Sequence, residues 1–145
     1  MVIVQFQIAE IICGMNIDDI QEIKKMTEIT AVHHAPDYVR GVINLRGQIV
    51  TVIDVRKKFR FEAHKDEQSF FVIIVSNGGE LIGLLVDEVN DAIRIDSEKL
   101  QPPPANVGAI EGYFFTALYK TDTMLVSIID KDRVIEEQEA LVEEN

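Results

Sequence analysis

The sequence lacks tryptophan and long apolar runs, and it has one cysteine in 145 residues. A single thiol cannot form an internal disulfide, which fits the reducing cytoplasm. Cys13 lies in the apolar stretch IICGM and is expected to be a small core residue rather than a nucleophile. The longest apolar runs, residues 70–75 and 81–86, are too short to span a bilayer.

Positive charge is also scarce. Lysine and arginine number 14 against 25 acidic residues, which gives a net charge of −11. Without a basic field, binding to nucleic acid or to an anionic membrane surface is not expected, and the charge favours a monomer in isolation. The start, MVIVQFQIAEII, has no basic flank and no small-residue cleavage site, so it is interpreted as a strand rather than a signal peptide.

What the sequence does contain is a globular composition with 47% hydrophobic and 27% charged residues. No internal repeat or linker is evident, and residues 1–145 are expected to form a single domain. An acidic segment at residues 130–144 is expected to begin a helix near Asp130 and to expose a solvated face, with its apolar side formed by Val134, Ile135, Leu141 and Val142.

Short apolar segments separated by turn residues predict a mainly β fold. Strands are expected at residues 2–8, 11–17, 70–75, 80–86, 114–120 and 124–129. In NIDDIQEI, isoleucines recur every three residues, which fits either a helical turn or a turn leading into a strand. Pro36 predicts a short helical turn at residues 37–39. Many short strands with little helix indicate a barrel or a sandwich, and there are enough strands for two small barrels.

The stretch RGVINLRGQIVTVIDVRKKF combines strand-forming residues with a central arginine. Apolar residues alternate on both sides of Arg46-Gly47, so these two residues are expected at the tip of a hairpin, where glycine supplies a positive φ. Asp54 is expected to cap one or two helical turns in VRKKF. Arg46 beside Arg40 could be an exposed arginine with little role, or one that waits for a partner.

Candidates for catalysis are weak. His33 and His34 are adjacent, so in a strand they would point to opposite faces, and they are interpreted as surface residues beside a turn; His64 lies alone in a polar loop. The acidic pairs Asp18-Asp19 and 87–88 lack glycines at ligand spacing and are expected to be solvated, with Asp87 able to pair with a basic residue. No metal, cofactor or catalytic site is predicted.

Residues 39–59, VRGVINLRGQIVTVIDVRKKF, closely resemble the signature of the CheW family of bacterial chemotaxis coupling proteins. IVQFQI, GMNIDDIQEI, APDYVRG, NGGELIGLLVDEVNDAIRI and MLVSIIDKDRVI follow the family's order, so the resemblance covers nearly the whole chain. It implies two intertwined five-stranded SH3-like barrels on a shared core. It also implies a non-enzymatic cytoplasmic adaptor that couples the cytoplasmic tips of chemoreceptors to the regulatory domain of the histidine kinase CheA, peripheral to membrane receptor arrays.

The resemblance further implies a groove between the barrels that takes the helical tip of a receptor. The residues matched to this groove are Val4, Ile17, Ile20, Ile23 and Arg46. Glu22, Arg40 and Gly41 match positions associated with coupling to the kinase or to the receptor, and they are interpreted as kinase-coupling residues without an assignment of which partner each one touches. Alternatives left open are the coupling portion of CheV, a small hydrolase or metal-dependent enzyme, and a dimer subunit without a signalling role.

Overall fold

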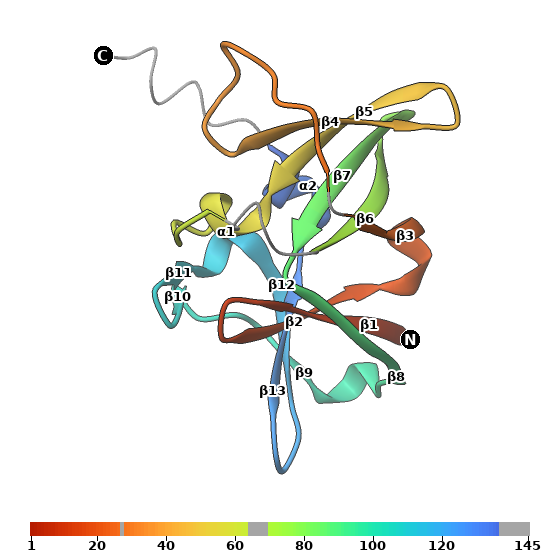
Figure 1. Ribbon diagram of the computed structural model, residues 1–145. Helices are drawn as coiled ribbons and strands as arrows, with labels where there is room; N and C mark the ends of the chain where they lie inside the picture. The colour runs from red at the N-terminus through yellow and green to blue at the C-terminus, as the bar shows by residue number, and fades with distance from the viewer. Residues whose placement is uncertain (27, 64–69, 137–145) are drawn as a thin grey trace.

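The chain folds as two packed β-sheets with a few short helices (Figure 1), and the computed structural model describes residues 1–26, 28–63 and 70–136. Within these residues, no helix has the length and hydrophobicity that a membrane span requires. A further two-stranded pair, β10 (Asn106–Val107) and β11 (Ile110–Glu111), lies at one side of the fold.

One sheet has six strands in the order β8-β1-β2-β13-β12-β9. Their bounds are β1 (Val2–Ile8), β2 (Ile11–Asn16), β8 (Glu88–Arg94), β9 (Leu100–Gln101), β12 (Phe115–Lys120) and β13 (Leu125–Ile129). The sheet is antiparallel except for the pairing of β13 with β2. It therefore joins the start of the chain to its end, so the two halves of the sequence are intertwined.

The other sheet has five strands in the order β3-β6-β7-β5-β4. Their bounds are β3 (Ile20–Met26), β4 (Val39–Leu45), β5 (Gln48–Asp54), β6 (Phe70–Asn77) and β7 (Glu80–Val86). Thr30, which follows β3, forms an isolated bridge to Val42 of β4, with two backbone hydrogen bonds of 2.8 and 3.0 Å. The sheet is therefore curled so that the chain after one edge strand meets the other edge strand.

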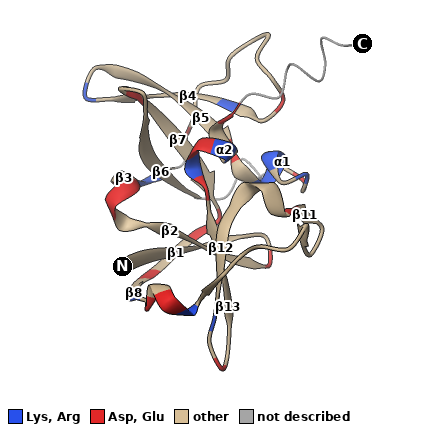
Figure 2. Cartoon of the chain, turned by 180° about the vertical axis from the view of Figure 1, so that it is seen from behind, with Lys and Arg blue, Asp and Glu red and all other residues tan. Residues whose placement is uncertain are grey.

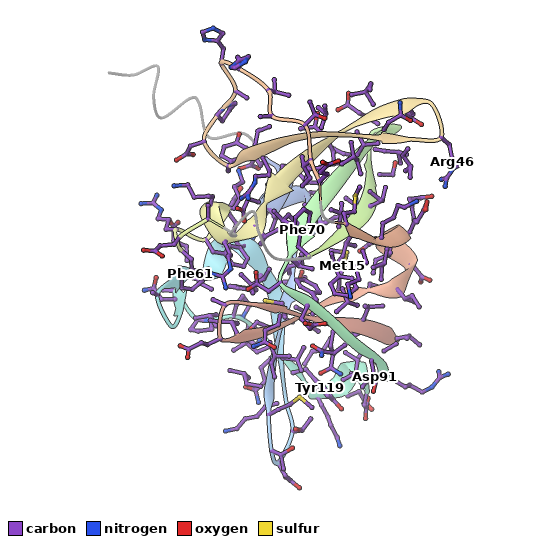
Figure 3. The ribbon with its side chains drawn as sticks, viewed as in Figure 1. Met15, Arg46, Phe61, Phe70, Asp91 and Tyr119 are labelled. Carbon is purple, nitrogen blue, oxygen red and sulfur yellow. The ribbon has the colours of Figure 1, made fainter. Side chains whose placement is uncertain are left out.

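The hydrophobic core is divided into separate clusters, some inside a curled sheet and one between the two sheets. One cluster fills the inside of the five-stranded sheet and includes Val50, Val52 and Phe70. The largest cluster lies between the sheets and includes Met15, and Figure 3 shows Met15 and Phe70 in the interior. Cys13 belongs to the same intersheet cluster, and burial raises the pKa of its thiol. Its expected core position is confirmed.

The helices are short and begin where the sequence predicts. The helix α1 (Val55–Lys58) is capped by Asp54, whose side chain accepts a hydrogen bond of 3.0 Å from the amide of Arg56. The helix α2 (Lys131–Ile135) is capped by Asp130, and its buried residues include Val134 and Ile135. The other two residues of its expected apolar side, at positions 141 and 142, lie outside the described residues, as does His64.

Several predictions of local structure are confirmed and one needs correction. Both faces of β6 and β7 are largely buried, as their continuous apolar pattern predicts. The turn expected at residues 37–39 is present but does not continue as a helix: the amide of Val39 bonds to the carbonyl of Pro36 at 3.0 Å, which closes a single turn, and β4 begins at once. The first sheet also has six strands rather than five, because the two-residue strand β9 adds to its edge.

Candidate functional site

Arg46 lies at the tip of the β4–β5 hairpin, as its place beside Gly47 predicts. Both residues have positive φ angles, 51° for Arg46 and 83° for Gly47, as tight hairpin turns of this length require. The amide of Gly47 also donates to the side chain of Asn44 at 2.9 Å, which fixes the turn. Figure 3 shows Arg46 at the outer end of this hairpin. The turn therefore presents the guanidinium at a defined place on one edge of the fold. We call this edge, formed by the hairpin tip at Arg46, the 3-10 helix Ile17–Asp19 and β3, the rim.

At this rim, Arg46 pairs with Glu22 of β3. The closest contact joins the guanidinium to a carboxylate oxygen at 2.9 Å, and the side chains are 71% and 25% exposed. Lys24 contacts the same carboxylate at 3.7 Å. An ion pair with this exposure contributes at most about 1 kcal/mol to folding. Both partners can therefore exchange this contact for one with another molecule at small cost.

A bulge in β3 explains the spacing of the isoleucines. Ile20 lies opposite Val75 and Ile23 lies opposite Ile73, with a register shift between them. Directly opposed residues share a face of a sheet, and Val75 and Ile73 both belong to the intersheet cluster. A spacing of three would put Ile20 and Ile23 on opposite faces of a regular strand, so the extra residue restores them to one face. Of the two alternatives for this segment, a turn leading into a strand is the correct one: it begins with the 3-10 helix Ile17–Asp19 and continues as β3.

The four predicted apolar residues differ in how accessible they are. Ile17 and Ile23 are 43% and 37% exposed, which is high for isoleucine in a folded domain. Ile20 is half-buried against the intersheet cluster, and Val4 is 6% exposed in β1. Of these four residues, Ile17 and Ile23 therefore supply most of the accessible apolar surface, and Ile20 and Val4 supply less.

Arg40 lies elsewhere, at the beginning of β4. Its guanidinium pairs with Asp54 at 3.2 Å, where the side chains are only 17% and 2% exposed. Since Asp54 also caps α1, this pair ties the strand to the helix. The structure thus brings Glu22 together with Arg46, but it separates both from Arg40.

Gly41 is held against the chain that follows β3. A Cβ atom at this position would lie 2.0 Å from the carbonyl oxygen of Thr30, and the backbone has a φ of +151°. Only glycine allows the backbone of Thr30 to approach this closely. Gly41 therefore makes possible the bridge that closes the curl of the five-stranded sheet.

The expected basic partner of Asp87 is Arg56. The Nε atom of Arg56 donates to both carboxylate oxygens at 2.8 and 2.9 Å, and this bond raises the pKa of the guanidinium. Asp87 also accepts a hydrogen bond of 2.6 Å from the amide of Ala9, in the turn between β1 and β2. Asp87 therefore connects α1 to the six-stranded sheet, which is a structural role.

The weak candidates for catalysis are placed as surface features. His33 and His34 are exposed in a turn, where His34 has a φ of 62°. Asp18 and Asp19 lie in the 3-10 helix that directly precedes β3. Across the described parts of the chain, no group of three or more histidine, cysteine, aspartate or glutamate side chains is arranged to hold a metal ion.

Two features of the rim were missed by the sequence reasoning. The ion pair between Glu22 and Arg46 joins β3 to the end of β4, and these strands are opposite edges of the five-stranded sheet, so no local pattern predicts it. Ile49, opposite Asn44 next to the hairpin tip, is 63% exposed, the largest exposed fraction among the large hydrophobic residues that the structure describes. The alternation of residues 49, 51 and 53 places Ile49 on the outer face of β5. The sequence does not show, however, that this face is uncovered at Ile49.

The two sheets thus define a β-domain that exposes isoleucine side chains and an arginine, and arginine is among the residue types enriched at protein-binding hot spots. Comparison with known proteins adds the family. The model of the CheW-like domain matches residues 2–139. The chain therefore belongs to the CheW-like family, whose members act as adaptors in bacterial chemotaxis.

Individual relatives agree with this assignment. The chemotaxis protein CheW of Thermotoga maritima is 34% identical over 136 residues, which cover 93% of this chain and 87% of that protein. That of Klebsiella aerogenes is 28% identical over 132 residues, or 91% of this chain and 80% of the relative. The crystal structure of the scaffolding protein TtCheW from Thermoanaerobacter tengcongensis matches with a TM-score of 0.85 and 36% identity, covering 94% of this chain and 88% of that one. The mainly β fold of two packed, intertwined sheets that the resemblance implies is confirmed, with six strands rather than five in one sheet.

Proposed function

We propose that the chain is a non-enzymatic adaptor that couples the cytoplasmic tips of chemoreceptors to the histidine kinase CheA, so that receptor state controls kinase activity. It acts in the cytoplasm, peripheral to membrane receptor arrays, and needs no cofactor. The observation that carries this proposal is the rim where exposed Ile17 and Ile23 lie on the strand and turn that also bear Glu22, the partner of Arg46.

The rim suits a helical partner for physical reasons. Isoleucine side chains that are 43% and 37% exposed offer apolar area that a helix can cover, and this burial supplies affinity. Arg46 contributes charge and hydrogen-bond donors in a fixed position at the hairpin tip, which orient the partner. Val4 and Ile20 offer a partner less area, since Val4 is buried and Ile20 packs against the intersheet cluster.

Coupling to the kinase is assigned to Glu22, Arg40 and Gly41, with different physical roles. Glu22 is accessible and can exchange its partner Arg46 for a group on another protein. Arg40 and Gly41 act through the backbone of β4, because the first is paired with buried Asp54 and the second packs on Thr30. Substitutions at these two positions are therefore expected to alter coupling by deforming β4.

Reconstitution tests the proposal. CheA and a receptor cytoplasmic fragment are combined with or without the chain, and kinase activity is measured as phosphate transfer from ATP. Control of the kinase by the receptor fragment is expected only when the chain is present. The variant Arg46→Glu should lose this control, whereas Arg94→Glu, the same charge reversal on exposed β8, should retain it. Equal kinase activity with and without the chain would overturn the adaptor function.

A further inference from the structure

A polar cavity lies around α1, away from Arg46. Its volume is about 400 Å³, and it is lined by Asp37, Tyr38, Lys57, Lys58, Arg60 and Phe61. Figure 2 shows the basic residues of α1 in blue next to α2, and Figure 3 shows Phe61 on the far side of the fold from Arg46. Three of the lining side chains are basic and one is acidic, whereas the chain as a whole has a net charge of −11. This cavity, which we call the basic pocket, therefore has a charge opposite to that of the whole molecule.

The backbone holds one of these basic residues in a strained conformation. After α1, the amide of Arg60 bonds to the carbonyl of Lys57 at 3.0 Å, and that of Phe61 bonds to the carbonyl of Arg56 at 2.8 Å. These bonds form a Schellman motif, whose left-handed position is usually glycine. Here it is Arg60, with a φ of 69° and a side chain that is 76% exposed. The backbone therefore disfavours an arginine at this position, and what the arginine adds there is a positive charge.

The acidic residues near the basic pocket hold its cations only loosely. Lys57 contacts Asp37 at 3.5 Å, and Arg60 contacts Glu111 at 3.7 Å. The two carboxylates are 79% and 56% exposed, so solvent screens both pairs. An anionic ligand can therefore replace these carboxylates without breaking a strong interaction.

Lys58 and Tyr38 form a fixed wall of the basic pocket. Lys58 is 4% exposed, and its ammonium group lies 4.0 Å from the centre of the Tyr38 ring. The same ammonium group donates a hydrogen bond to the carbonyl oxygen of Glu136, just after α2. These contacts fix the position of Lys58 in the wall. Tyr38 and Phe61 are both half-buried and add aromatic surface beside the cations.

We propose that the basic pocket binds the phosphoryl group of a small phosphate ester. Three cations and one carboxylate leave two positive charges in excess in the lining, and a phosphate monoester carries a charge of about −1.5 to −2 at pH 7. Arg60 offers a planar fork of hydrogen-bond donors and Lys57 a mobile ammonium group, and both suit phosphate oxygens. The volume lies in the range of small-molecule sites, roughly 300–1,000 Å³, which leaves room for an organic group against Tyr38 and Phe61. This inference does not rest on the adaptor function.

Titration of the full chain with phenyl phosphate, followed by NMR of the backbone amides, tests this directly. Sodium chloride at the same ionic strength is the reference, because it separates binding from screening. Phenyl phosphate is expected to cause saturable shifts at the amides of residues 57–61, and inorganic phosphate should shift the same amides with weaker affinity. Benzoate, which has the same ring and a single charge, should bind about tenfold more weakly than phenyl phosphate. Shifts no larger than those in chloride, or equal binding of benzoate, would overturn the proposal.

The variant Arg60→Gly separates binding from folding. Glycine adopts a φ of 69° without strain, so this variant should be at least as stable to urea as the parent chain. It should nevertheless bind phenyl phosphate about tenfold more weakly, because the guanidinium is lost. The control Arg94→Glu, on exposed β8, changes the net charge further and should bind as the parent does. Full binding by Arg60→Gly, or the same weakening in Arg94→Glu, would contradict a site at the basic pocket.

A third titration identifies the source of the phosphoryl group. A short peptide with one phosphoserine between two alanines carries the same group without an aromatic ring. It is expected to bind more weakly than phenyl phosphate, since it leaves the surfaces of Tyr38 and Phe61 uncovered. Tighter binding of the peptide would mean that the pocket takes a phosphorylated protein and would overturn the assignment to a small ester. Failure of the receptor and kinase assay would leave these results unaffected, so the two proposals fail separately.

Discussion

The two ends of strand β4 carry arginine–carboxylate pairs of opposite character. At the beginning of the strand, Arg40 and Asp54 are 17% and 2% exposed, and Asp54 also caps α1. Beyond its other end, Arg46 and Glu22 are 71% and 25% exposed. The distances are similar, 3.2 and 2.9 Å, so distance alone does not separate the two roles. Burial does, because a buried pair is needed for folding whereas an exposed pair is available to a partner.

The largest effect on stability is expected at the buried end of β4. Gly41→Ala would place a methyl group 2.0 Å from the carbonyl oxygen of Thr30, so the bridge between Thr30 and Val42 must break or shift. We expect a loss of about 3 kcal/mol or more in the free energy of unfolding, measured by urea denaturation.

The matched control is Gly47→Ala at the exposed tip. A Cβ atom there meets nothing within 4 Å, so only the positive φ of 83° opposes the substitution, at a cost of about 1–2 kcal/mol. Equal losses for the two glycines would contradict the distinction between the ends of β4.

The carboxylates provide the next comparison. Asp54→Ala removes the partner of Arg40 and the cap of α1 together, and we expect a loss of about 3 kcal/mol. Glu22→Ala removes a partly exposed carboxylate whose partner Arg46 is 71% exposed, and the expected loss is below about 1 kcal/mol. Thermal and urea unfolding of both variants measure the difference. A Glu22 variant as unstable as the Asp54 variant would mean that the rim pair is structural.

The smallest effect is expected at Tyr113. Its pKa is raised above the ordinary tyrosine value, first by the hydrogen bond to Glu136 and then by desolvation. The protonated hydroxyl is therefore favoured by folding, so its contribution is present below the ordinary pKa and is lost as the pH rises through the raised value. The absorbance of tyrosinate at 295 nm is measured for the chain and for Tyr113→Phe, and the difference between them reports Tyr113. This difference should show that Tyr113 ionises at a higher pH than an ordinary tyrosine. In Glu136→Ala the titration should return toward the ordinary value, and an unchanged titration would exclude the hydrogen bond as the cause.

Local chemistry made much of the fold predictable. Glycine at hairpin tips, the aspartate caps of α1 and α2 and the unbroken apolar pattern of β6 and β7 each act within a few residues, so the sequence displays them directly. The strand β8 was not predicted, because an edge strand with exposed polar residues has no apolar alternation to reveal it. Pro36 favours a turn, and the sequence could not show that pairing with β5 would start β4 at once.

The candidate site was predictable only in part. The place of Arg46 followed from the turn residues, but its pairing with Glu22 depends on the curl of a whole sheet, which no short stretch encodes. The bulge in β3 also hid the strand, because it gives isoleucines on one face the spacing of a helix. Arg40 and Arg46 are alike in sequence, and only their burial separates them.

The central claim is that Arg46 serves binding and not folding. The most direct test is a calorimetric titration of the chain and of Arg46→Glu with a receptor cytoplasmic fragment, alongside urea unfolding of both. The account predicts that Arg46→Glu binds at least tenfold more weakly while its free energy of unfolding changes by less than about 1 kcal/mol. Binding at full strength, or a large loss of stability in this variant, would contradict it.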